Sequence, residues 1–430
     1  MNIIEDYIFM PKKRLFYTLR TFWKKLGPGL ITGASDDDPS GIATYSQAGA
    51  QYGLSTLWTA LITFPLMAAI QEMCARIGLV TSKGLTGTLR DHYSRPILYL
   101  MVLFSFPAIV MNIGANIAGM GAVGNLLVPT IPSEFFSIGF TALLFVLIIY
   151  LPYRKFASIL KYLCIVLLVY LIVPFLYKQD WLAILKGTLI PKITFDKKYI
   201  SILVGILGTT LSPYLFFWQA TMVAEDNSHK RKKIIIDKKI LGDIKQDVDF
   251  GMLFSNIVMF FVILTSGTVL FNGGIHNIET VEQAALALRP LAGDAAYLLF
   301  ALGVIGTGLL AIPVLCGSLS YIITESFGWK RGLDKKFHQA KAFYVVAGIS
   351  LILGLIINYI GISPIKALLW SAILYGLTAP VLIAIILHIA NNKEVMGNFT
   401  NNKFSNFMGF TALILMSIAA LTLIYLQILD

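Results

Sequence analysis

The stretch GPGLITGASDDDPSG, residues 27–41, decides the fold because it interrupts an apolar span with a proline and three carboxylates. Asp38 lies about ten residues into the span, which at about 1.5 Å per residue is half of the ~30 Å hydrocarbon core of a bilayer. Pro39 removes a backbone donor and disfavours helix at the residue before it, while Gly41 lowers the cost of irregular backbone. We therefore expect the helix to break at Asp38, where the freed carbonyls need a partner such as a cation.

The alternative is a purely structural role, in which the proline kinks the helix and the carboxylates bond to neighbouring helices. Ionisable residues near the middle of a bilayer are costly and usually mark a functional path, so we favour function here. Successive helical residues point about 100° apart, and the three carboxylates therefore cannot all face one site. We expect Asp38, at the break, to bind a cation, and Asp36 and Asp37 to line a vestibule or cavity beside it.

The composition of the chain agrees with a membrane protein. Of 430 residues, 57% are hydrophobic and 13% are charged, against about 45–50% and about 25% in soluble proteins. These values exclude an ordinary soluble enzyme and a disordered chain. The sequence predicts an all-α polytopic protein of about eleven transmembrane helices. Their expected limits are 27–50, 54–79, 97–128, 135–152, 156–177, 200–224, 250–272, 294–325, 342–360, 365–390 and 405–428.

Basic residues predict the orientation, because Lys and Arg concentrate in cytoplasmic loops. With the N-terminus inside, the inner connections hold six in residues 1–26, seven in 230–245 and five in 330–341. We expect a protein of the cell (inner) membrane with a cytoplasmic N-terminus and an external C-terminus. The net charge of +11 is then an orientation signal, and the basic run at 229–233 is a solvated loop. The sequence indicates no nucleic acid, no cofactor and no obligatory protein partner.

A second break is expected in the sixth span, at Gly208-Thr-Thr-Leu-Ser-Pro-Tyr214, where Pro213 lies about mid-span. Pro39 and Pro213 open corresponding first helices in two groups of five spans, and an odd number of spans inverts the second group. Paired broken helices in such inverted repeats mark a transporter's site at the bilayer midplane. The predicted units are a cytoplasmic segment 1–26, a first repeat 27–199, a second repeat 200–391, and a loop with the eleventh helix, 392–430.

Several motifs now identify a resemblance. The residues at 27–29 (GPG), Asp38-Pro39, the stretch QAGAQYG at 47–53 with Trp58, and ARIG at 75–78 resemble the first two helices of the Nramp family of divalent-metal transporters. The resemblance covers nearly the whole chain, and eleven spans in this order also fit. It implies a LeuT-type fold with a 5+5 inverted repeat, in which helices 1 and 6 are broken, and a transported divalent metal ion as substrate.

The site departs from the family pattern. The family's first-helix motif Asp-Pro-Gly-Asn reads Asp-Pro-Ser-Gly here, so Gly41 stands where the family has its Asn ligand. The sixth-helix motif Met-Pro-His-Asn reads Ser-Pro-Tyr-Leu, so Ser212 replaces the methionine whose thioether binds the metal. A family Ala whose carbonyl faces the metal aligns with Thr209. The resemblance therefore implies a metal site of Asp38, Gly41, Thr209 and Ser212. The combination is most similar to the Nramp-related magnesium transporters.

The chemistry of these residues points the same way. Thioethers favour softer metals, whereas carboxylate, carbonyl and water suit Mg²⁺ and Mn²⁺. A small residue at the break leaves a roomy, hard site for a largely hydrated ion. The alignment places Ile113 and Asn116 at the family's acidic third-helix positions, and Tyr214 replaces its His, which can shuttle protons near neutral pH. We expect weak or absent proton coupling.

Two further features stay open at this stage. Glu72 and Arg76, four residues apart, form either a local ion pair or part of a gate. Gln219 either lines the cavity or packs. The main alternative function is an ordinary proton-coupled Mn²⁺/Fe²⁺ importer. An organic-solute carrier on the same fold is less favoured, and so is an intramembrane aspartyl protease, which needs two carboxylates from separate spans.

Overall fold

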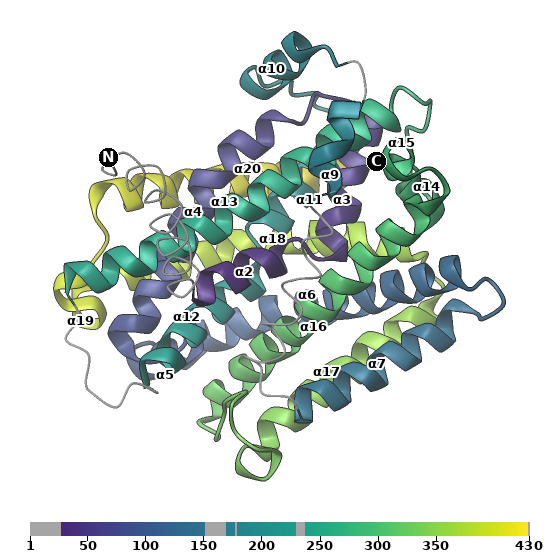
Figure 1. Cartoon of the computed structure of the whole chain (residues 1–430). Coiled ribbons are helices and arrows are strands. Elements are labelled where there is room, and N and C mark those ends of the chain that lie inside the picture. Colours follow the sequence, from purple (N-terminus) through teal and green to yellow (C-terminus); the bar gives the residue numbers. More distant parts are fainter. Residues whose placement is uncertain (1–26, 151–168, 177–178, 229–236, 429–430) are drawn as a thin grey trace, which may run out of the picture.

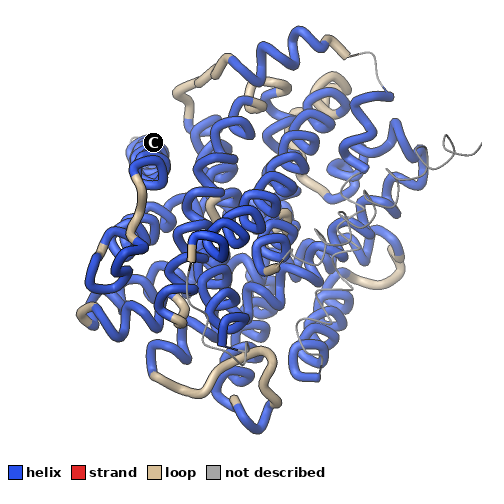
Figure 2. Tube along the Cα trace, turned by 60° about the vertical axis from the view of Figure 1, so that its left-hand side comes forward, coloured by secondary structure: helices blue, strands red, loops and turns tan. Residues whose placement is uncertain are grey.

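The structure is a computed structural model that describes residues 27–150, 169–176, 179–228 and 237–428. Within these ranges every regular element is a helix (Figures 1 and 2). The predicted N-terminal segment 1–26 and most of the fifth span, 156–177, lie outside the described residues. Of that span only α9 (Val169–Ile172) and η3 (Val173–Leu176) are described.

The all-helical membrane fold is confirmed, with eight described segments long and apolar enough to cross a bilayer. Beside the two broken helices, the long helices agree with the predicted spans to within a few residues, except where noted below. They are α4 (Trp58–Thr81), α6 (Arg95–Leu127), α7 (Ser133–Tyr150), α13 (Lys238–Val269), α16 (Ala296–Phe327), α17 (Lys341–Ile357), α18 (Pro364–Asn391) and α20 (Lys403–Ile428).

The connections contain short helices that the hydropathy pattern does not predict. They are α5 (Leu85–His92), α10 (Trp181–Leu189), α14 (Val281–Ala285), η4 (Leu286–Leu288), α15 (Arg289–Ala292), η5 (Gly293–Ala295), η6 (Phe337–Gln339), η7 (Asn358–Ile360), α19 (Lys393–Met396) and η8 (Gly397–Phe399). The expected start of the seventh span near residue 250 is wrong, because α13 begins at Lys238. Its polar first turns are capped by Asp237, whose carboxylate accepts from the Ile240 amide at 2.8 Å, and a hydropathy window excludes such turns.

The helices pack in two groups. The broken-helix group contains α2 (Pro28–Asp36), α3 (Pro39–Tyr52), α4, α12 (Pro213–Ser228) and α13, and the α6 group contains α6, α7, α16 and α17. Figure 1 shows α7 and α17 side by side at the edge of the molecule, with α2 near its centre. Helix α18 contacts both α3 and α6, and α20 packs on α18. The broken helices therefore lie inside the bundle, against the α6 group.

Small residues bring α2 and α13 into backbone contact. A Cβ added at Gly33 would lie 2.1 Å from the Gly251 carbonyl oxygen, so no side chain fits there. Small residues allow this close approach of helices in membranes, where apolar side chains gain little by leaving lipid. Large apolar residues instead face outward, as at Leu103 on α6 and Leu421 on α20, which are 68% and 66% exposed. The bundle is thus tight inside and apolar outside.

Candidate metal-transport site

The first span breaks where the sequence predicts it. Helix α2 ends at Asp36, α3 begins at Pro39, and Asp38 between them has an extended backbone with φ −71° and ψ 170°. Asp38 caps α3, because its Oδ1 accepts from the Gly41 amide at 2.9 Å and from the Ser40 hydroxyl at 2.6 Å. Ser40, which stands at a glycine position of the family pattern, thus helps to orient the carboxylate.

The second oxygen of Asp38 is held from another helix. The Nδ2 atoms of Asn112 and Asn116, both on α6, donate to Asp38 Oδ2 at 2.9 and 3.0 Å. The two amides are four residues apart and therefore lie on one face of α6. Asn112 is fixed in turn, because its Oδ1 accepts from the Ser371 hydroxyl of α18 at 3.1 Å. Asp38 therefore joins the broken-helix group to the α6 group.

Asp36 and Asp37 have a different environment. Both turn to α13, where the Ser255 hydroxyl lies 2.8 Å from Asp36 Oδ2 and 3.3 Å from Asp37 Oδ1. Asp36 Oδ1 and Asp37 Oδ2 are buried and have no hydrogen-bond partner. The two carboxylates therefore share a single hydroxyl donor at the carbonyl end of α2, where the helix dipole already favours positive charge.

The sixth span also breaks as predicted, between α11 (Lys197–Thr210) and α12. The Thr209 hydroxyl donates to Tyr45 Oη of α3 at 3.0 Å. The Ser212 hydroxyl donates to the Gly208 carbonyl at 3.2 Å and also to the Thr209 carbonyl. In this conformation the Ser212 hydroxyl bonds to carbonyls at the end of α11, and the Thr209 hydroxyl joins α11 to α3.

Two more contacts join the broken helices. The Tyr214 hydroxyl donates to the Ser35 carbonyl at 2.7 Å, and the Thr32 hydroxyl donates to Gln219 Oε1 at 2.5 Å. Both bonds run between α12 and α2. The Tyr214 bond uses a carbonyl that the break in the first span leaves free, and the Gln219 bond joins two side chains. Tyr214 and Gln219 thus hold the half-helices α2 and α12 together.

Gly41 does not open an empty space in this conformation. A Cβ added there would lie 3.3 Å from the Asp36 carbonyl oxygen and 3.4 Å from the Tyr45 ring. The expected room at the break is filled by Tyr45, which also accepts the Thr209 hydrogen bond. The small residue at position 41 therefore lets the two broken helices meet through Tyr45.

The site is closed from both sides. Its seven predicted side chains are each at most 2% exposed: Asp36, Asp37, Asp38, Thr209, Ser212, Tyr214 and Gln219. The described residues contain no group of three or more His, Cys, Asp and Glu side chains that could hold a metal ion. A cation at Asp38 would therefore take its other ligands from amide, hydroxyl or carbonyl oxygens or from water, all of which are hard ligands.

Glu72 and Arg76 form the predicted pair on one helix. Arg76 donates to Glu72 Oε1 at 2.9 Å and to Oε2 at 3.1 Å. It also bonds to the Phe399 carbonyl at 2.8 Å and to Asn401 Oδ1 at 2.5 Å. The pair thus fastens the end of α4 to the loop before α20.

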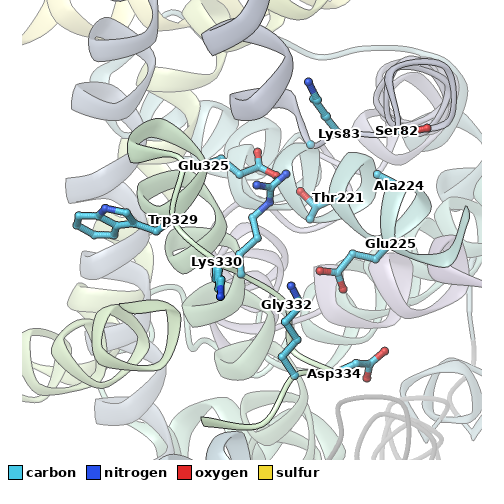
Figure 3. Close-up of a pocket in the computed structure, with 13 residues that line it drawn as sticks. Ser82, Lys83, Thr221, Ala224, Glu225, Glu325, Trp329, Lys330, Gly332 and Asp334 are labelled. Atoms are coloured by element: carbon cyan, nitrogen blue, oxygen red, sulfur yellow. The ribbon is translucent and has the colours of Figure 1, made fainter. Parts of the chain in front are cut away.

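A cavity of about 460 Å³ opens at the end of the molecule near α5. Figure 3 shows Glu325 and Thr221 close together in it, with Glu225 and Asp334 lower in the view. Glu325 is nearly fully buried, lies 2.9 Å from Arg331 Nε, and accepts from the Gly87 amide at 2.7 Å. The bond between Gly87 and Glu325 joins α5 to α16. The residues that line this cavity lie outside both helix breaks.

The start of α2 is also fastened at this end. The Gly27 and Gly29 amides each donate to the Asp247 carboxylate of α13 at 2.7 Å. A carboxylate is favourable at a helix N-terminus, where amides lack helical partners. Half-helix α2 is therefore held to α13 at both ends, by Asp247 at its start and by Ser255 at its end.

Sequence reasoning missed the partners of the carboxylates. Asn116 is recognised from the sequence only as the replacement of a family acid on the third helix, and the sequence predicts no site role for Asn112, Ser255 or Tyr45. One signal was available, because two amides four residues apart in an apolar span share a face and need polar partners. Which carboxylate they meet depends on how the helices pack.

Comparisons with known proteins identify related sequences and structures. Residues 29–426 match the family described as "Natural resistance-associated macrophage protein-like". The "Divalent metal cation transporter MntH" of Granulibacter bethesdensis is 23% identical over 390 residues, which cover 90% of this chain and 84% of that protein. The protein of the same name from Pectobacterium carotovorum is 24% identical over 392 residues, covering 89% and 90%. These relatives carry the names of transporters rather than enzymes.

Solved structures show the same fold. The Eremococcus coleocola manganese transporter, in complex with an aromatic bis-isothiourea substituted compound, has a TM-score of 0.74 at 19% identity, covering 93% of this chain and 86% of that one. Mhp1, a nucleobase-cation-symport-1 family transporter in a closed conformation, has a TM-score of 0.51 at 12% identity, covering 93% and 92%. The predicted all-helical polytopic membrane fold is therefore confirmed, and the described residues contain eight segments long and apolar enough to span a bilayer and both predicted breaks.

Proposed function

Because the chain belongs to the Nramp family, we propose that it carries divalent metal cations across the membrane by alternating access. The names of its relatives, divalent metal cation transporter and manganese transporter, support this substrate class. We further propose that Mg²⁺ and Mn²⁺ are the ions, that they cross largely hydrated, and that proton coupling is weak or absent. These properties would group the chain with the magnesium-transporting branch of the family.

The position of Asp38 is the observation that carries the proposal. It is a buried carboxylate at the end of a broken helix, and it is bonded to both helix groups. An ionisable group deep in a bilayer is costly, so its presence beside a broken helix indicates an ion path. The ion would bind at Asp38 with oxygens from the two breaks, at Gly41, Thr209 and Ser212.

The remaining predicted residues would shape the path. Asp36 and Asp37 would line the approach and attract cations, since each keeps an oxygen without a partner. Tyr214 and Gln219 would tie α12 to α2 while the site is closed. Glu72 and Arg76 would act as a local ion pair that anchors α4, because the other donors of Arg76 bond to the loop before α20.

The preference for hard ions rests on the atoms around the two breaks. Amides and hydroxyls donate the hydrogen bonds that Asp38 accepts, and Ser212 bonds to backbone carbonyls. Oxygen ligands suit Mg²⁺ and Mn²⁺, and Mg²⁺ loses its waters reluctantly. A proton-coupled Mn²⁺/Fe²⁺ importer remains the alternative, and Tyr214 at the position of the family's His argues against it.

The distribution of Lys and Arg supports an orientation with the N-terminus and the α5 end on the cytoplasmic side of the cell membrane. An inside-negative potential would then drive divalent cations inward, at about 2.3 kcal/mol per charge per 100 mV. An uncoupled carrier of this kind needs no proton path.

Ion flux into proteoliposomes with an internal pH probe tests the proposal. Both Mn²⁺ and Mg²⁺ should enter, Mg²⁺ should compete with Mn²⁺, and the internal pH should stay constant during uptake. Acidification that accompanies Mn²⁺ uptake would contradict the uncoupled mechanism. Failure of Mg²⁺ to enter or compete would contradict the proposed selectivity, and absence of any divalent flux would contradict the transport function.

A further inference from the structure

The hydrogen bonds of Asp38 leave no oxygen lone pair for a cation. An ionised carboxylate has about four acceptor sites, and Asp38 accepts four hydrogen bonds, at 2.6 to 3.0 Å. A cation can therefore bind Asp38 only if at least one donor leaves. The identity of that donor determines how binding is linked to the rest of the protein.

The two oxygens differ in how firmly their donors are held. Ser40 and Gly41 belong to the first turn of α3 and move with Asp38, and losing such a cap costs about 1 kcal/mol of helix stability. Asn112 and Asn116 reach Oδ2 from α6, in the other helix group. The oxygen that can be freed without disrupting α3 is thus Oδ2.

The two asparagines also differ from each other. Asn112 Oδ1 accepts from Ser371, so turning that amide would break two bonds. Asn116 Oδ1 is buried and has no hydrogen-bond partner, and the side chain is 0% exposed. A buried amide oxygen without a partner is costly, and here it belongs to the same amide whose nitrogen contacts Asp38.

We propose that Asn116 is a ligand of the transported cation: its amide turns about the Cβ–Cγ bond, withdraws Nδ2 from Asp38 and presents Oδ1 to the ion. Rotation exchanges the two atoms of the amide in nearly the same place, so one movement removes a donor and supplies an oxygen ligand. Asn112 stays bonded to Ser371 and acts as a positioning residue for the Asp38 carboxylate. This inference rests on the proposed transport of a divalent cation at Asp38.

The consequence is a change in the link between the two helix groups. Without the ion, α3 and α6 are joined by amide–carboxylate hydrogen bonds; with the ion, they are joined by a cation that Asp38 and Asn116 share. Binding then strengthens the contact between α3 and α6 instead of breaking it, as expected for an occluded state of a carrier.

Direct Mn²⁺ binding to the purified full-length protein tests this, with the bound fraction measured from the electron paramagnetic resonance signal of free aqueous Mn²⁺. Asn116→Ser should raise the Kd by about tenfold. Asn112→Ser should raise it less, by about threefold, because a positioning bond is lost but no ligand. Asn116→Asp keeps an oxygen ligand and adds charge, so it should bind Mn²⁺ at least as tightly as the wild type. Asn256→Ser, which removes a buried amide bonded to Thr63, is the matched control and should leave the Kd unchanged.

Equal weakening by Asn112→Ser and Asn116→Ser, or no weakening by Asn116→Ser, would overturn the inference. If Asn116→Ser does not give a monodisperse protein, Asn116→Asp decides, and a Kd more than about threefold above wild type contradicts the ligand role. Asp38→Asn in the same assay separates the two proposals. Loss of binding there with wild-type binding in Asn116→Ser refutes only this inference, whereas wild-type binding in Asp38→Asn refutes the proposed site itself.

Discussion

Asp38 and the pair Asp36–Asp37 are adjacent in the chain but have opposite surroundings. Asp38 accepts four hydrogen bonds from α3 and α6, whereas the pair shares one hydroxyl, that of Ser255, and keeps two oxygens without partners. The break in the helix makes this difference, because it turns Asp38 toward α6 and leaves its neighbours facing α13. The carboxylate of Asp38 is thus held in one orientation by its four donors, and Asp36 and Asp37 add negative charge beside it.

The largest expected effect is at the defined site. Asp38→Asn keeps the size of the side chain but removes its charge, and the single oxygen of a neutral amide accepts at most two hydrogen bonds and binds a cation more weakly than a carboxylate does. We expect Mn²⁺ uptake into proteoliposomes to fall by about 100-fold or more. Gel filtration and unfolding temperature should show that the variant still folds. Normal uptake would show that Asp38 is not the site.

Neutralising the pair should have a smaller effect. In Asp36→Asn or Asp37→Asn the other carboxylate remains, and one charge beside a hydrated ion that enters through an open, water-filled vestibule is worth about 1 kcal/mol. Each variant should therefore raise the apparent KM for Mn²⁺ about fivefold and leave the maximal rate almost unchanged. Loss of transport as complete as in Asp38→Asn would remove the distinction between the two regions.

The shared donor offers a test through stability. Ser255→Ala leaves both buried carboxylates without a hydroxyl partner, which costs about 1–3 kcal/mol. We expect a lower unfolding temperature in detergent. Ser255→Thr restores the hydroxyl and should recover most of the loss. An unchanged unfolding temperature in Ser255→Ala would show that the pair does not depend on this bond.

The smallest effect is expected at the second break. Tyr214→Phe removes the bond to the Ser35 carbonyl but keeps the ring, which stacks on Tyr375 with centroids 5.8 Å apart. Such a bond is worth about 1 kcal/mol, so the maximal rate should change by less than about fivefold and the KM should stay constant. A large rise in KM would place Tyr214 on the ion instead.

The two breaks could be predicted from the sequence because each depends on local chemistry. Pro39 and Pro213 each remove a backbone donor at mid-span beside polar and glycine residues. Proline alone does not decide a break, because α4, α6, α16 and α18 each continue through an internal proline. The start of α13 could not be predicted this way, since its first turns are polar. Helix capping by Asp237 decides that boundary, and it is hidden from a search for apolar runs.

The candidate site could be predicted only in part. Asp38 stands out because few charges lie deep in the spans. Its partners Asn112 and Asn116, and the division of the triplet between α6 and α13, depend on the register of helices far apart in the chain. The room expected at Gly41 is filled by Tyr45 for the same reason. The identity of a residue in a single sequence does not show which distant helix its side chain will contact.

Anomalous scattering from crystals grown with Mn²⁺ tests the central claim most directly. The account predicts a peak bound to Asp38 Oδ2, with Asn116 Oδ1 as a second protein ligand. A peak between the free oxygens of Asp36 and Asp37, with Asp38 still bonded to its four donors, would contradict it.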